Sequence, residues 1–259
     1  MISFSIITCT YQAASLLERT LESVRSQTWA EVEHVLIDGA SGDGTVDMIR
    51  GYQAEVSADE DSRHSVVFVS EPDKGLYDAM NKGIRKATGD YLVFLNAGDV
   101  LPSPDTLETI ANSVGEGEPL PAVLYGDTDV VDEEGRFLRH RRLAPPRQLS
   151  WRSFKGGMLV CHQAFYARVD IARDVPYDLN YRLSADVDWC IRIMKEAEKC
   201  HLSLRYVPAV LVNYLAGGMS VKNHRASLKE RFSIMCRHYG VVTTVFAHLW
   251  FVLRSVLRR

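Results

Sequence analysis

The fold is decided by residues 4–45, FSIITCTYQAASLLERTLESVRSQTWAEVEHVLIDGASGDGT, which contain a strand pattern, a helix pattern and a second strand pattern in turn. Residues 4–9 and 32–37 are short apolar runs, and residues 13–27 place Leu16, Leu17, Leu21 and Val24 on one helical face. The alternation continues with predicted elements at 45–54, 66–70, 76–87 and 91–95. Strands joined by helical crossovers predict an α/β fold with a Rossmann-like, mostly parallel central sheet and helices on both faces.

The regular alternation stops after Asp99. Beyond it the sequence predicts a helix at 104–114, a strand at 122–125 and a hairpin at 128–143 that turns at residues 133–135. A helix at 187–197, strands at 204–206 and 210–214, and a helix at 222–239 follow. This second half is predicted to extend the same sheet and to end in a helical extension.

Composition and charge exclude several classes of protein. The 259 residues are 46% hydrophobic and 24% charged, which is typical of a soluble globular protein. Residues 1–135 carry a net charge of −17 and residues 136–259 a net charge of +14, so a uniformly basic nucleic-acid-binding protein is excluded. Five cysteines without a C-x-x-C pair exclude a zinc ribbon, and the first residues show no signal peptide, so a cytoplasmic location is predicted.

Carboxylates follow two of the predicted strands. Parallel α/β sheets bind ligands beyond the carboxyl ends of their strands. Asp38, at the end of the second strand, is suited to accept the imide N–H of a uracil or thymine, or else it begins a turn. Asp99, after the fourth strand, is suited to a divalent cation on a diphosphate, or else it is an acidic turn residue. The chain has neither Gly-Lys-Ser/Thr nor G-x-G-x-x-G, which disfavours P-loop and dinucleotide-binding proteins.

Four stretches in a fixed order carry a family resemblance: SIITCTY (5–11), LIDGASGDGT (36–45), EPDKGLYDAMNKGI (71–84) and GDYLVFLNAGD (89–99). They are followed by YGD (125–127), CHQ (161–163), SADVDW (184–189) and GGMS (217–220). The series resembles the family 2 glycosyltransferases of bacterial surface-polysaccharide assembly, over about residues 3–220.

The resemblance implies a GT-A fold, a nucleotide-sugar donor linked to UDP, GDP or dTDP, a Mg²⁺ or Mn²⁺ ion, and inversion at the anomeric carbon. It also implies a glycosyltransferase domain at 1–220, with a nucleotide-sugar-binding half at 1–100 and an acceptor-side half at 101–220. The donor-binding positions it implies are Thr8, Tyr11, Asp38, Lys74, Asp78 and Asn96. Asn96 and Gly98 depart from the family's D-x-D-type element, which leaves Asp99 as its metal-binding carboxylate.

The acceptor side of the site is implied by the later motifs. An inverting transfer needs a base for the acceptor hydroxyl, and Asp186 matches the family's base, with Asp188 as the second choice. Both aspartates could instead complement the dipole of the helix that begins there. His162 is expected to be a hydrogen-bonding residue near the acceptor. Gly218 and Ser220 belong to a turn that either cradles a diphosphate or is an ordinary loop.

The C-terminal segment is basic and amphipathic. Residues 222–259 hold eight basic residues and one acidic residue, and one helical face collects apolar side chains from Val242 to Leu257. The uncharged run at 241–253 is shorter than the ~20 residues that span a bilayer. The basic amphipathic helices predicted at 221–259 are therefore expected to bind an anionic membrane surface, or else to pack on the enzyme's own core or on a second subunit.

The leading hypothesis is an inverting, metal-assisted glycosyltransferase that extends a saccharide at the inner face of the cytoplasmic membrane, and the acceptor is expected to be lipid-linked. A nucleotidyltransferase is a second hypothesis, but residues 8–15 lack the glycine-rich and basic loop that would bind a triphosphate. A catalytically weak nucleotide-sugar-binding module is the third, because of Asn96 and Gly98.

Overall fold

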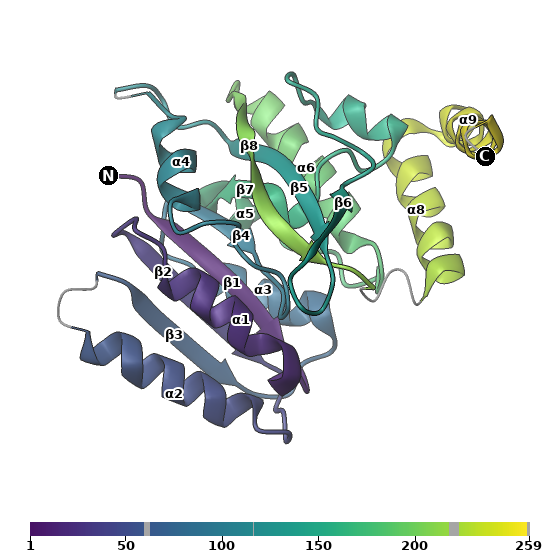
Figure 1. Cartoon of the computed structure of the whole chain (residues 1–259). Helices are drawn as coiled ribbons and strands as arrows, with labels where there is room; N and C mark the ends of the chain where they lie inside the picture. Colours follow the sequence, from purple (N-terminus) through teal and green to yellow (C-terminus); the bar gives the residue numbers. More distant parts are fainter. Residues whose placement is uncertain (60–62, 116, 218–222, 258–259) are drawn as a thin grey trace.

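A central mixed sheet organises the molecule. The computed structural model describes residues 1–59, 63–115, 117–217 and 223–257. Within them an eight-stranded sheet has the order β3-β2-β1-β4-β7-β5-β6, with β8 also paired to β5 (Figure 1). The strands are β1 (Phe4–Thr10), β2 (Val32–Asp38), β3 (Ser65–Ser70), β4 (Tyr91–Phe94), β5 (Val123–Val131), β6 (Phe137–His140), β7 (Phe165–Arg168) and β8 (Leu204–Leu215).

The strands that carry the first predicted site are parallel. β1 pairs in parallel with β2 and β4, and β2 pairs in parallel with β3. The register sets Thr10 opposite Asp38 and Ile7 opposite Phe94. The carboxyl ends of these strands therefore meet at one edge of the sheet, and the predicted fold class is confirmed.

Helices cover both faces of the sheet. Ile7 and Phe94 share one apolar cluster with α3 (Leu76–Lys86), α5 (Val169–Asp174) and α6 (Ala185–Lys199). Phe4, Ile6 and Val93 point to the other face, which α1 (Ala14–Arg25) and α4 (Thr106–Asn112) cover, and α2 (Thr45–Ala58) packs beside α1. Alternation of side chains along each strand gives both faces an apolar layer.

The second half differs from the prediction in detail. β5 is one strand that includes the predicted strand at 122–125 and the first arm of the hairpin, and β8 is one strand through Pro208 rather than two. The register between β5 and β8 shifts on both sides of Asp127, as it does at a β-bulge. Four short elements were not predicted: η1 (Trp151–Gly156), η2 (His162–Ala164), β7 and α5. β7 lies antiparallel between β4 and β5.

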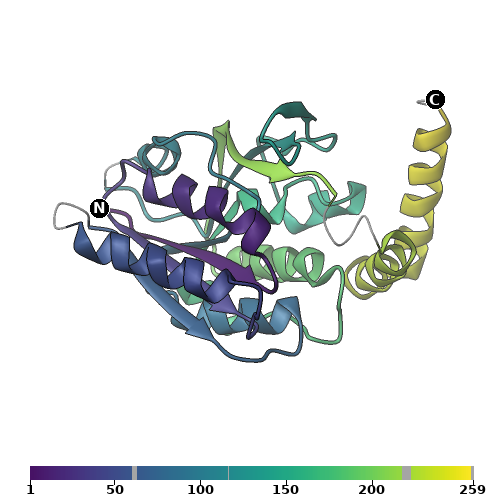
Figure 2. The same cartoon turned by 60° about the horizontal axis from the view of Figure 1, so that its bottom comes forward.

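Two helices complete the chain. α8 (His224–Tyr239) packs against α6, and α9 (Val241–Leu257) turns away from it at Gly240, whose φ is 82°. Figure 2 shows α9 projecting from the body of the molecule, with α8 between them. None of the described helices is long and apolar enough to cross a membrane.

Candidate functional site

Asp38 ties together the ends of three segments at the carboxyl edge of the sheet. Its Oδ1 accepts hydrogen bonds from the hydroxyls of Thr10 (2.9 Å) and Ser41 (2.6 Å), and its Oδ2 accepts from the Ser41 N–H (2.9 Å) and the Ser70 hydroxyl (2.7 Å). Burial alone would raise the pKa of this carboxyl, but these hydrogen bonds together hold the pKa below its usual range. Four donors occupy the acceptor positions of the carboxylate. A nucleobase N–H would have to displace one of them.

An exposed tyrosine lies beside Asp38 and is better placed to meet a ligand. The Tyr11 side chain is 69% exposed. A Cβ on Gly39 would lie 3.2 Å from Tyr11 Cδ2 and 2.7 Å from Asp73 Oδ2, so only glycine fits between these two side chains. Asp73 Oδ1 accepts the Gly75 N–H (2.8 Å). Tyr11, Gly39 and Asp73 thus meet at one point. Asp73 was not among the site residues predicted from the sequence, although its position after the third predicted strand pointed to this edge of the sheet.

Thr8 does not face this edge. It has no exposed surface, its hydroxyl donates to the Leu95 carbonyl (2.7 Å), and the same oxygen lies 3.0 Å from His34 Nε2. The predicted contact of its side chain with a nucleoside is therefore corrected: Thr8 joins β1 to the end of β4 from inside the fold.

Lys74 and Asp78 form the turn that leads into α3. The Lys74 N–H donates to Asp78 Oδ2 (3.0 Å), and the Lys74 side chain is exposed. This turn follows directly after Asp73. Both predicted donor-site residues consequently belong to the same edge of the sheet as Tyr11.

Asp99 is enclosed rather than open. It is 2% exposed, its Oδ1 accepts the Leu215 N–H (2.8 Å), and its Oδ2 accepts Gln163 Nε2 (3.0 Å). Burial raises the pKa of Asp99 to about 6, although hydrogen bonds from Leu215, Gln163 and Asn96 oppose this. Asn96 is half-buried beside it. The carboxylate fastens the segment after β4 to the end of β8 and to η2.

The glycine before Asp99 has a steric reason. Gly98 has a φ of 95°, and a Cβ there would lie 2.5 Å from Leu215 Cδ2. The close passage of β8 thus favours glycine where the related element has an acid. The described residues contain no group of three His, Cys, Asp or Glu side chains arranged to hold a metal ion. Asp99 is enclosed in this structure, and its contact with a Mg²⁺ or Mn²⁺ ion stays a prediction.

Asp186 opens the first turn of α6 and is accessible. Its Oδ1 accepts the Tyr77 hydroxyl (3.3 Å), and its Oδ2 lies 3.9 Å from His162 Nδ1. Burial raises the pKa of Tyr77 well above its ordinary value, so the phenol stays a neutral donor. Burial also lowers the pKa of His162 more than the nearby Asp186 raises it, so the imidazole is neutral at pH 7. Among the described atoms, His162 Nε2 is buried without a hydrogen-bond partner.

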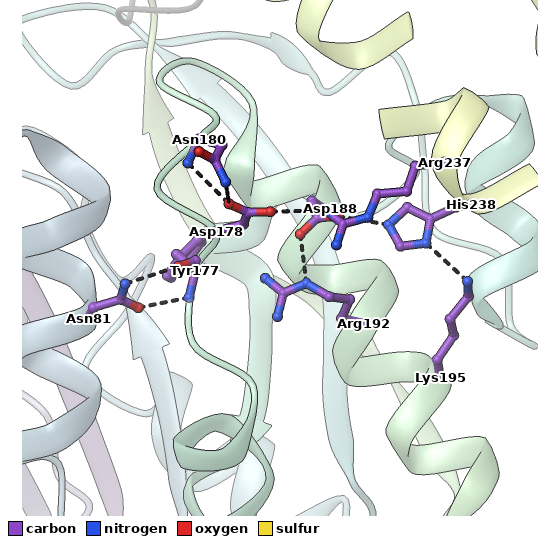
Figure 3. A network of polar contacts seen from close by, with 9 residues as sticks. All are labelled: Asn81, Tyr177, Asp178, Asn180, Asp188, Arg192, Lys195, Arg237 and His238. Carbon is purple, nitrogen blue, oxygen red and sulfur yellow. Dashed lines mark hydrogen bonds and ion pairs between the residues drawn. The ribbon is translucent and has the colours of Figure 1, made fainter. Parts of the chain in front are cut away.

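A rigid aromatic floor lies under Asp186. The rings of Tyr77 and Tyr177 stack with centroids 5.2 Å apart, and Tyr177 stacks on Trp189 at 5.0 Å. The side-chain amide of Asn81 makes two hydrogen bonds to the backbone of Tyr177 (Figure 3). Asn81 Oδ1 accepts the Tyr177 N–H (2.7 Å), and Asn81 Nδ2 donates to the Tyr177 carbonyl (3.1 Å). The floor fixes the hydroxyl of Tyr77 that meets Asp186.

Asp188 lies on the side of α6 opposite to Asp186, and both of its oxygens accept hydrogen bonds. It has no exposed surface, and its oxygens lie 2.6 Å from Arg192 Nε and 2.7 Å from His238 Nε2 (Figure 3). Burial would raise the pKa of Asp188, but the bonds from His238 and Arg192 hold it below its usual range. Asp188 joins α6 to α8 and has no surface to offer a substrate.

Two adjacent residues of η2 bring the two halves of the site together. His162 faces Asp186, while Gln163 donates to Asp99. η2 therefore links Asp99, at the carboxyl edge of the parallel strands, to Asp186, the predicted base. This short element was not predicted from the sequence. Gly218 and Ser220, which were predicted to cradle a diphosphate, lie outside the described residues.

Comparison with known proteins finds close relatives of one kind. Residues 5–175 match the model of glycosyl transferase family 2. Over 219 residues the chain is 36% identical to the PGL/p-HBAD biosynthesis glycosyltransferase of Mycobacterium bovis (strain BCG / Pasteur 1173P2), covering 84% of this chain and 78% of that protein. It is 25% identical over 222 residues to the amylovoran biosynthesis glycosyltransferase AmsB of Erwinia amylovora, covering 82% and 69%.

Solved structures share the fold at low sequence identity. S. aureus TarS 1-349 in complex with UDP-GlcNAc superposes with a TM-score of 0.68 and 16% identity, over 90% of this chain and 64% of that one. This chain thus spans less than two thirds of the TarS fragment. The mannosyltransferase PcManGT from Pyrobaculum calidifontis, in complex with GDP-Man and Mn²⁺, has a TM-score of 0.62 and 18% identity, over 95% and 74%. At such identities the likeness shows the fold alone.

Proposed function

The chain belongs to glycosyl transferase family 2 and has a GT-A fold, and from this premise we propose that it moves a sugar from a nucleotide-sugar donor to a growing surface glycan, with inversion at the anomeric carbon. The relatives named for PGL/p-HBAD and amylovoran biosynthesis support a glycan acceptor. The neighbours bound to UDP-GlcNAc and GDP-Man support a nucleotide-sugar donor.

The nucleoside end of the donor is proposed to bind where Tyr11, Gly39 and Asp73 meet. The exposed ring of Tyr11 offers a face for a base. Asp73 Oδ2, next to the bare Cα of Gly39, offers an acceptor for a base or ribose hydrogen. Asp38 shapes this edge from below, because its oxygens are already occupied by Thr10, Ser41 and Ser70.

Asp186 is proposed as the general base. The acceptor hydroxyl attacks the anomeric carbon, the bond from that carbon to the diphosphate oxygen breaks, and the hydroxyl proton passes to Asp186 Oδ2. A single displacement of this kind inverts the configuration. The observation that carries the assignment is the contrast along α6: among the described residues nothing hydrogen-bonds Asp186 Oδ2, which lies beside neutral His162, whereas Asp188 is enclosed by Arg192 and His238.

The nitrogen of His162 that faces Asp186 is Nδ1, 3.9 Å from Asp186 Oδ2. We propose that this nitrogen hydrogen-bonds the acceptor hydroxyl beside the base. The Mn²⁺ bound in PcManGT supports a divalent ion on the donor diphosphate, with Asp99 as its proposed carboxylate ligand; such an ion would neutralise charge on the departing diphosphate.

The acceptor is proposed to be presented at an anionic membrane surface, on which α9 lies. Seven apolar side chains form a stripe on α9 with exposures of 41–71%: Val241, Val242, Val245, Phe246, Leu249, Trp250 and Leu253. The polar Thr244 is fully buried, so α9 turns its apolar stripe outward. The excess of basic residues in 222–259 complements anionic lipid.

The first test identifies the donor and the base together. A panel of UDP-, GDP- and dTDP-linked sugars is screened for thermal stabilisation, since a ligand that binds the folded state raises stability by RT ln(1 + [L]/Kd). With the stabilising donor and a saccharide acceptor, Asp186→Asn should retain donor affinity and lower kcat by ~10²–10⁴-fold.

Asp188→Asn is the matched variant two residues away. It should lower the melting temperature, since it removes the charge that pairs Arg192 and His238. Turnover per folded molecule should fall much less than in Asp186→Asn. Normal kcat in Asp186→Asn would contradict the base assignment. A wild-type protein that neither binds nor transfers from any donor of the panel would contradict the proposed function.

A further inference from the structure

Helix α8 reaches the loop that precedes the proposed base. Glu230, the single acidic residue of 222–259, points from α8 to three consecutive backbone amides. Its Oε1 accepts the Arg182 N–H (2.9 Å), and its Oε2 accepts the N–H groups of Leu183 (2.8 Å) and Ser184 (2.9 Å). One carboxylate thus fixes the chain at the entrance to α6.

The N-terminus of α6 has no side-chain cap of its own. Ser184 stands at the N-cap position, yet its side chain makes no capping hydrogen bond within the helix. Its hydroxyl lies 2.9 Å from the Ser227 hydroxyl and 3.3 Å from the Ser227 carbonyl, both on α8. Orphan N–H groups at a helix start need partners. Here α8 supplies the partners of the residues just before the helix.

A second set of contacts fixes the rotation of α6 about its axis. Asp188 and Lys195 of α6 both meet His238 of α8, at 2.7 and 3.0 Å (Figure 3). Residues two apart in a helix point about 200° from each other. Because Asp188 is held toward α8, Asp186 is turned toward Tyr77 and His162.

We propose that Glu230 is a positioning residue for Asp186, which makes α8 part of the active-site architecture; this inference rests on the proposed function. Hydrogen bonds from N–H groups to a carboxylate are charge-assisted and stronger than neutral ones. Three of them, two to four residues before the base, set the start of α6 and therefore the place of the Asp186 carboxylate. Among the described residues the hydrogen bonds of Glu230 go to residues 182–184, and none goes to Tyr11, Asp38 or Asp73.

Glu230→Gln tests the proposal, because glutamine keeps the shape but replaces one acceptor oxygen by an N–H₂ group that cannot accept. A misplaced reacting group costs rate without a loss of binding, and a shift of about 1 Å can cost ~10²-fold. We expect kcat per donor-binding site to fall roughly 10- to 100-fold, with donor Kd within twofold of wild type. The number of donor sites, titrated by calorimetry, removes any effect of unfolded protein.

Tyr239→Phe is the matched control on the same helix. Its hydroxyl donates to the Trp151 carbonyl (2.6 Å) at the far end of α8, so the variant loosens α8 without touching residues 182–184. Its kcat per donor site should equal that of the wild type. Amide hydrogen exchange of residues 181–185 should accelerate in Glu230→Gln and stay unchanged in Tyr239→Phe.

The outcomes separate the two proposals. If the wild type transfers sugar and Glu230→Gln keeps kcat per donor site, or if residues 181–185 exchange at the wild-type rate, the role of Glu230 is overturned. Absence of transfer by the wild type is instead a failure of the proposed function. Should Glu230→Gln not fold, Glu230→Asp keeps the charge on a side chain one methylene shorter, and the same fall in kcat at unchanged donor Kd is expected.

Discussion

The carboxylates at the edge of this sheet differ in how many of their oxygens accept hydrogen bonds from the chain. Asp38 ends β2 and Asp99 follows β4, the two strands that flank β1, and both are enclosed by hydrogen bonds from their own chain. In the part of the chain that the structure describes, Asp73 and Asp186 each keep one oxygen that accepts no hydrogen bond. A carboxylate that is fully paired in the fold holds segments together, and one with a free oxygen can meet a substrate.

Asp99 predicts a specific dependence of stability on pH. Burial raises its folded pKa to about 6 from an ordinary value of 3.8. Between these values the folded state binds more protons than the unfolded state, so the contribution of Asp99 to stability falls as pH rises and is constant above about pH 6. The free energy of unfolding of wild type minus that of Asp99→Asn should therefore decrease from pH 4 to pH 6.5, by up to about 3 kcal/mol.

Urea denaturation of both proteins at half-unit pH steps measures this difference. Asp47→Asn, at an exposed position of α2, sets the background for replacing one carboxylate. A difference between wild type and Asp99→Asn that rises with pH would show that the folded state favours the charged form of Asp99.

At the scale of elements, the pairing of β5 with β8 connects the two halves of the site. β8 runs parallel to β5 from Val123↔Leu204 to Val131↔Leu215, and the amide of Leu215 then binds Asp99. β8 leaves no room for a side chain at Gly126 of β5, where a Cβ would lie 2.6 Å from Leu211 Cγ and 2.8 Å from the Ala209 carbonyl oxygen. The glycine is needed for this approach.

Gly126→Ala should therefore destabilise the protein by about 1–3 kcal/mol, because the added methyl group meets backbone as well as a side chain. Gly51→Ala is the control: nothing lies within 4 Å of its Cβ in α2, and alanine there should stabilise the helix by about 0.5–1 kcal/mol. Urea denaturation gives both values. Equal stability of Gly126→Ala and wild type would show that β8 moves freely against β5.

At the scale of the whole molecule, the two halves of the chain carry net charges of opposite sign. The acidic half contains the parallel strands and the donor edge, and the basic half ends in α8 and α9. α8 docks on α6 and carries Glu230, whereas α9 leaves the body of the molecule with its apolar stripe outward (Figure 2).

Replacement of Phe246 and Trp250 by serine should reduce binding to anionic liposomes without a change in melting temperature, since both side chains are more than half exposed. Phe137→Ser is the control, because Phe137 is 56% exposed on β6, away from α9. Flotation with and without anionic lipid measures binding. Equal flotation of all three proteins would contradict the membrane surface, and a change from dimer to monomer in the double variant would assign the stripe to a second copy of the chain.

The sequence by itself determined the parallel half of the sheet, the helices on its faces and the family, because strand and helix periodicities and the ordered motifs are local properties of the chain. It also singled out Asp186. Only the tertiary structure decided which carboxylates are free: the partners that enclose Asp38, Asp99 and Asp188 come from segments up to 116 residues away, such as Leu215 for Asp99. The proposed roles of Asp73 and Glu230 also rest on contacts that only the tertiary structure shows: Asp73 lies beside Gly39, and Glu230 binds the amides of residues 182–184. No local sequence pattern encodes such long-range contacts.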